Sequence, residues 1–153
     1  MDVTLTREHP MRTTFTFLFT LSLSVPTLAD AKKDSDLKKM QGTWMIAKEI
    51  VAGRELTAKE IKENMPTLTV KCGTYSVSIK GSEIDKGTMK LSSGKSPKEI
   101  DTTSSSGTKL KGIYQIKGDE MTVVFASPGQ PRPKAVKYEK GSSQIWIVYR
   151  RKN

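Results

Sequence analysis

Few residues in this chain have side chains suited to covalent or metal chemistry. The only histidine is His9 and the only cysteine is Cys72. His9 lies in a leader-like segment, so the rest of the chain lacks the histidine that catalytic triads, Cys–His dyads and histidine-bearing zinc sites require. Cys72 ends an alternating apolar run, and we expect it to be an inert core thiol rather than a nucleophile.

The acidic residues show no spacing that brings two carboxylates together, as a glycoside hydrolase would require. Asp101 falls near a strand end, where it can pair with a lysine, and Asp119 falls in a hairpin turn. Arg132, in the proline-rich segment 127–133, either recognises an anion or anchors the loop to a backbone carbonyl. We predict that the protein is not an enzyme, with a hydrolase as the less favoured alternative, and we expect no metal and no cofactor.

An apolar run at residues 15–25 has the length of a signal-peptide core and follows Arg12. Small residues come next, so cleavage is expected after Ala29 or Ala31. The alternative is an uncleaved membrane anchor, but the run is short for a bilayer core of about 30 Å.

The chain therefore divides into a signal peptide, residues 1–31, and one domain, residues 32–153. Met11 competes with Met1 as the start, because Arg12 already supplies a basic N-terminal region. We predict an exported bacterial protein, periplasmic or extracellular, with no membrane span after cleavage.

The charge balance is strongly basic, with 26 Lys and Arg against 16 Asp and Glu and a net charge of +10. Such a charge attracts polyanions, although a solvated lysine-rich surface is the simpler interpretation. Nucleic acid is disfavoured, because almost no aromatic residues lie between the lysines to stack on bases.

The period of the apolar residues predicts an all-β fold of about eight short antiparallel strands. The expected strands span residues 43–51, 68–72, 75–80, 87–91, 97–103, 110–116, 121–126, 134–138 and 144–150. Lys48 interrupts one face of the first strand, so its far part is expected to bend.

Two short helices are also expected. The first, within residues 32–40, should place Leu37 and Met40 over one end of the fold. The second starts at a capping box, Thr57 to Glu60, and ends near Asn64. It is either a lid that gates a ligand or, as we favour, a plug at an open end.

Four segments resemble an uncharacterised planctomycetal family of secreted, lipocalin-like domains. The segments are DLKKMQGTW (36–44), PKEID (97–101), GIYQIKGDEM (112–121) and the Pro-Gly and Arg-Pro pairs of residues 128–133. The resemblance covers nearly all of the chain after the leader and implies a small antiparallel β-barrel. The family's activity is unknown, so the resemblance implies no function.

The resemblance also implies a structural signature. Gly42 and Trp44 open the first strand, and an arginine of the last strand, Arg150 or Arg151, is expected to cover the Trp44 ring as a cation–π contact.

An eight-stranded barrel is either filled by side chains or holds one small ligand. We expect a mostly filled interior, with a small apolar pocket as the alternative. The interior candidates for ligand contact are Tyr75, Tyr114, Phe125 and Tyr138. Two functions follow: an exported carrier of a small apolar ligand or, alternatively, a ligand-free domain that binds cell-envelope or extracellular polyanions.

Overall fold

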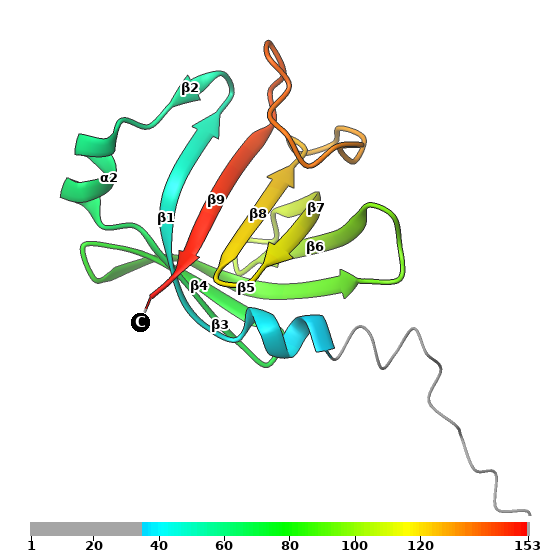
Figure 1. Ribbon diagram of the computed structural model, residues 1–153, viewed down its shortest axis with the longest axis horizontal. Helices are drawn as coiled ribbons and strands as arrows, with labels where there is room; N and C mark the ends of the chain where they lie inside the picture. The colour runs from blue at the N-terminus through cyan, green and yellow to red at the C-terminus, as the bar shows by residue number, and fades with distance from the viewer. Residues whose placement is uncertain (1–34, 153) are drawn as a thin grey trace, which may run out of the picture.

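The computed structural model describes residues 35–152 (Figure 1). The expected signal peptide, residues 1–31, lies outside the described residues. Within the described part of the chain, no helix is long and apolar enough to cross a membrane.

Nine strands and two helices make up the described chain. The strands are β1 (Gly42–Val51), β2 (Arg54–Glu55), β3 (Thr67–Lys71), β4 (Thr74–Ile79), β5 (Ser82–Ser92), β6 (Lys98–Ser104), β7 (Lys109–Lys117), β8 (Glu120–Phe125) and β9 (Ile145–Arg151). The first helix covers residues 35–40, and the second is α2 (Ala58–Asn64).

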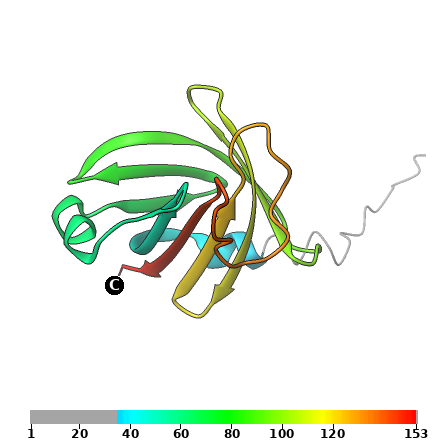
Figure 2. The same ribbon diagram turned by 90° about the horizontal axis from the view of Figure 1, so that it is seen from above.

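Eight of these strands form a closed antiparallel barrel. The alternating pattern predicted the all-β class, and the resemblance implied the barrel. Neighbours in the sequence pair from β3 to β9, and β1 closes the ring by pairing with both β3 and β9. Seen from above, β3, β4 and β5 curve across from β8 and β9 (Figure 2). The short β2 adds only to the end of β1.

A β-bulge in β1 changes which of its side chains face inward. The pairing with β9 is regular up to Ile46 and resumes at Lys48, so Ala47 is an extra residue. Beyond the bulge Glu49 pairs with Ile147, an inward position, whereas Ile50 pairs with Trp146 on the outer face. The change of direction expected near Lys48 is therefore present as a bulge, and it puts Ile50 on the face opposite to that of Trp44.

The first helix closes one end of the barrel, as its apolar spacing predicted. Met40 is 1% exposed and Leu37 packs against the buried core. Trp44 is fully buried, and its indole nitrogen donates a hydrogen bond of 2.8 Å to the Met40 carbonyl. Helix and first strand are thus joined through the largest core side chain.

The second helix is capped as predicted but does not plug the barrel. The Thr57 side chain accepts a hydrogen bond from the Glu60 amide, and Glu60 reaches back to the Thr57 amide. No residue of α2 is buried, and Ile61 lies against Met45 on the outer side of β1. The lid and plug interpretations are both wrong, because none of these residues borders the interior.

Two further expectations fail for local reasons. Residues 134–138 form no strand, because β8 pairs directly with β9 from Phe125 and Ile145 onward and leaves no place between them. The strand that was expected over residues 87–91 is β5, and it begins at Ser82, because the turn before it ends at Gly81.

Candidate ligand-binding cavity

The barrel encloses an apolar cavity of about 290 Å³. Its walls come from β1, β3 to β9 and the first helix. They are lined by Met40, Ile46, Glu49, Leu68, Val70, Tyr75, Val77, Ile84, Asp85, Met89, Ile100, Thr102, Leu110, Met121, Val123, Phe125, Ile145, Ile147 and Tyr149. The structure therefore favours the small apolar pocket over the mostly filled interior that we expected.

The cavity has a closed floor and an open mouth. Met40, which is almost fully buried, lies at the floor, and Ile84, which is 59% exposed, lies at the mouth. β1 pairs with β3 only from Gly42 to Met45, so the later part of β1 has no neighbour from β3 or β4. This separation leaves the barrel accessible beside Glu49.

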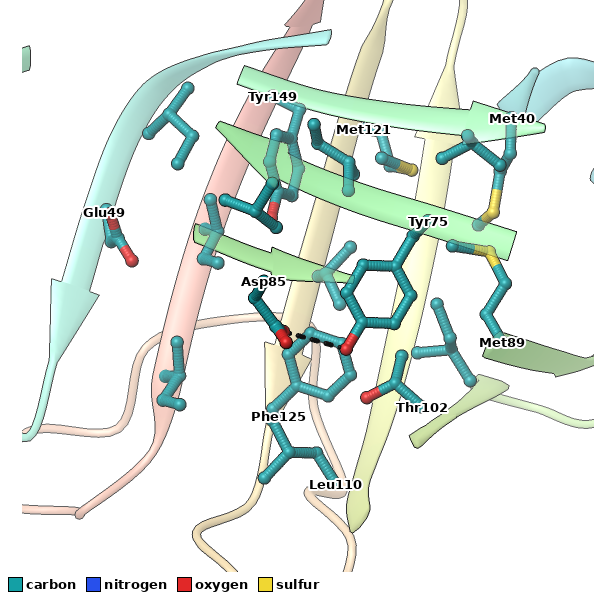
Figure 3. A pocket seen from close by; sticks show the side chains of 18 of the residues that line it. Met40, Glu49, Tyr75, Asp85, Met89, Thr102, Leu110, Met121, Phe125 and Tyr149 are labelled. Carbon is teal, nitrogen blue, oxygen red and sulfur yellow. Dashed lines mark hydrogen bonds between the residues drawn. The ribbon is translucent and has the colours of Figure 1, made fainter. Parts of the chain in front are cut away.

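Glu49 brings a carboxylate into this apolar space. The bulge at Ala47 places it on the inward face, and Figure 3 shows its side chain at the edge of the cavity. Desolvation by burial raises its pKa above the ordinary value. A partly buried carboxylate is stabilised by any ligand group that neutralises its charge or donates a hydrogen bond to it.

A second carboxylate, Asp85, lies in the same cavity, next to another bulge. Val77 pairs with Asp85 and Ser78 with Glu83, so Ile84 is the extra residue of β5. The Tyr75 hydroxyl donates a hydrogen bond of 2.9 Å to Oδ2 of Asp85 (Figure 3). Burial, followed by this bond to a carboxylate, raises the pKa of Tyr75 to about 12, so the hydroxyl stays protonated at neutral pH.

Tyr149 supplies a third polar group. Its side chain is buried in the wall, and its hydroxyl points into the cavity (Figure 3). Burial raises its pKa, and the charge of Glu49 adds to the rise. Among the side chains drawn in Figure 3, only Tyr75 and Asp85 are joined by a hydrogen bond. The hydroxyl of Tyr149 and the carboxylate of Glu49 are therefore open to a ligand.

The structure separates the four interior candidates into two groups. Tyr75 and Phe125 border the cavity, and Gly112 makes room for the Phe125 ring, since a Cβ there would lie 2.6 Å from it. Tyr114 is buried but does not border the cavity, which corrects its expected place on the inner wall. Tyr138 belongs to the loop between β8 and β9, beside Gly53, and does not border the cavity either.

Cys72 is exposed, which corrects its expected place in the core. Lys71 pairs with Thr74, so Cys72 and Gly73 form the two-residue connection between β3 and β4. Both have positive φ, 48° and 80°, as such tight hairpins require. The thiol therefore lies on a turn instead of on the inward face of the strand.

Arg151, near the end of β9, is hydrogen-bonded to the residues that precede β1 and covers Trp44. Arg151 covers the Trp44 ring at 4.2 Å from its centroid and donates to the carbonyls of Gln41 and Lys39. Arg150 is exposed and lies 3.9 Å from a Glu120 oxygen, so only Arg151 has the expected stacking role.

Arg132 anchors its loop, which was one of the two roles considered for it. Its Nη1 donates to the carbonyls of Ile100 and Gly112, at 3.1 Å and 2.6 Å. Its Nη2 lies 2.7 Å from Asp101, so Asp101 pairs with an arginine rather than with a lysine. The guanidinium is thus already occupied by the protein.

The sequence prediction missed three important acids. Glu49 faces the cavity only because of the bulge at Ala47, which alternation along the strand does not reveal. Asp85 alternates regularly with Met89 and was missed because its strand was expected to begin at Gly87. Asp36 is 3% exposed and binds Lys98 and Tyr114 at 2.6 Å and 2.8 Å. Asp36, Lys98 and Tyr114 each lie in one of the four segments that carry the resemblance. Their presence in those segments was the available signal for this contact.

Neither a protein-family model nor a curated protein matches this chain. Within residues 35–152, no group of three His, Cys, Asp or Glu side chains is arranged to hold a metal ion.

Proposed function

We propose that this protein binds one small, largely apolar molecule inside its barrel. The observation that carries the proposal is the cavity of about 290 Å³, which combines apolar walls with a few converging polar groups. Ligand sites in proteins have this composition and usually measure about 300–1,000 Å³. The cavity lies at the lower end of that range and suits a small ligand.

Export and family membership belong to the same proposal. The leader-like residues 1–31 support an exported binding protein, and the four quoted segments support a place among the lipocalin-like domains. The closed eight-stranded barrel is compatible with both.

A binding role is favoured over catalysis by the state of the two cavity acids. Asp85 already accepts a hydrogen bond from Tyr75, and Glu49 lies in a wall whose remaining side chains are mainly apolar. Such a site provides recognition without a positioned nucleophile or acid–base pair.

Binding of polyanions to the basic surface remains the second candidate, and the geometry favours it less. Several outer lysines are already beside carboxylates, as in the pairs Lys48–Glu55, Lys59–Glu63 and Lys86–Glu83. These carboxylates partly neutralise the neighbouring lysines, which weakens the attraction of the surface for a polyanion.

Titration with a neutral, environment-sensitive dye such as Nile red tests the cavity. We expect a saturable fluorescence increase with one site per chain, insensitive to salt. Val123→Phe, which fills the cavity from the inward face of β8, should weaken binding about tenfold or more. Thr122→Phe is the control, because it adds the same ring to the neighbouring residue of β8, which does not border the cavity.

Two results would contradict the proposal. One is the absence of saturable binding by the folded wild type. The other is an equal loss in both variants, since the dye would then be on the surface. Affinity for heparin that falls steeply with salt, together with no dye binding, would support the polyanion alternative.

A further inference from the structure

We propose that the cavity selects an apolar ligand with a cationic, hydrogen-bond-donating head, such as a primary alkylamine, and discriminates against carboxylates. This inference rests on the proposed function and defines the chemistry of its ligand. It follows from the polar groups of the cavity wall, in which two carboxylates lie among apolar side chains.

The two acids occupy different strands and present acceptors to the same space. Glu49 lies on β1, and Asp85 lies on β5, opposite Val77. No lysine or arginine is among the residues that line the cavity. An ammonium group entering at the mouth would therefore meet negative charge and acceptors, whereas a carboxylate would meet repulsion.

The hydroxyl groups extend the same pattern. Tyr75 directs its proton to Asp85, which leaves its oxygen lone pairs as further acceptors. The Tyr149 hydroxyl points into the cavity and can accept from the same head group. A primary ammonium has three donors and no acceptor, which matches a wall that offers mainly acceptors.

The overall charge of the protein makes this preference diagnostic. The whole chain carries a net charge of +10, so long-range attraction favours anions. A preference for a cation can therefore come only from local groups. In the apolar interior the local effect is screened less than interactions between solvent-exposed charges.

Three probes with identical tails separate the possibilities: octylamine, octanol and octanoate. Each is titrated into the protein at neutral pH and 150 mM salt by displacement of Nile red or by calorimetry. We expect octylamine to bind best, octanol less well and octanoate at least about tenfold more weakly than octylamine, as charge-assisted hydrogen bonds imply.

Glu49→Gln tests the source of the preference. It keeps the size of the side chain and removes its charge, so the gap between octylamine and octanoate should narrow while octanol affinity changes little. Glu55→Gln is the matched control, because it removes the same charge from the exposed β2, outside the cavity. It should leave all three affinities unchanged.

Each outcome has a defined meaning. Octanoate binding as well as octylamine would overturn the inference while leaving the cavity as a binding site. Failure of Nile red and all three probes to bind the folded protein would overturn the proposed function itself. An unchanged preference in Glu49→Gln, or an equal change in Glu55→Gln, would overturn the assignment to Glu49.

Discussion

Tyr114 donates a hydrogen bond of 2.8 Å to Oδ2 of Asp36, although the two residues lie 78 positions apart. Both side chains are buried, and Lys98 lies 2.6 Å from the same carboxylate oxygen. The contact fastens the first helix to β6 and β7. It also compensates for the removal of the Asp36 carboxylate from water.

Tyr114→Phe should lower the unfolding free energy by about 1–3 kcal/mol, because it removes one partner of a buried carboxylate. Urea denaturation measures the change. Tyr138→Phe, in the loop between β8 and β9, should change stability by less than about 0.5 kcal/mol. Nile red affinity should survive in folded Tyr114→Phe, because Tyr114 lies outside the cavity; a specific loss of affinity would contradict this placement.

Arg151→Gln should destabilise the barrel by about 2 kcal/mol, since it removes the stacking on Trp44 and the hydrogen bonds to two carbonyls. The neighbouring Arg150→Gln makes the same charge change at an exposed position. Its cost should stay below about 0.5 kcal/mol. Thermal denaturation of the two variants in parallel checks the difference, and similar costs would refute the separate role of Arg151.

The raised pKa of Glu49 predicts a specific dependence of stability on pH. A carboxyl with a higher pKa in the folded state binds more protons when folded, so its contribution to stability falls as pH rises from the unfolded to the folded value. Tyr149, Tyr75 and Asp85 are the titratable groups that border the cavity with it. The two tyrosines stay neutral in this interval because their pKa values are raised.

Glu49→Gln should therefore be more stable than the wild type at pH 8, and the difference should shrink as pH falls from the raised folded pKa of Glu49 towards the ordinary value of 4.5. Urea titrations of both proteins across this range measure it. Glu55→Gln, at an exposed ion pair, provides the comparison for a simple change of net charge. A Glu49→Gln advantage that stays constant with pH would show that ionisation of Glu49 is not its cause.

Cys72 should react with a thiol reagent in the native protein, with a stoichiometry of one and without denaturant. The prediction follows from its exposed position on the turn between β3 and β4. Cys72→Gly should fold without loss, because glycine adopts a φ of 48° more readily than cysteine. Reaction only after addition of urea would contradict the exposed placement.

Much of the fold could be predicted from the sequence because alternation and turn residues are local signals. The antiparallel all-β class, the capping box at Thr57 and the helix that places Met40 over one end all followed from such patterns. The closure into a barrel was expected from the resemblance. The stacked Trp44 was expected from the resemblance, and the structure assigns its partner as Arg151.

The candidate site could be predicted only in part, because its two acids were hidden for different reasons. The inserted Ala47 shifts the alternation of β1 by one position and puts Glu49 in the interior, whereas Asp85 lies in the part of β5 that was expected to be a turn. A bulge depends on the partner strand, so a single-sequence pattern does not reveal it. Cys72 was predicted to lie in the core for a related reason, because the alternation of β3 was extended by one residue into the turn that follows it.

The pairing of β1 with β9 also sets the order of events during folding. β1 is the earliest strand of the sheet, yet its contact with Arg151 joins positions more than a hundred residues apart. While the chain is being synthesised, β1 keeps one free edge until β9 has been made, and such non-local closure is slow. During that interval the exposed edge is open to pairing with other chains. The interior cavity comes into existence only when the ring closes, so a bound ligand would report completed folding.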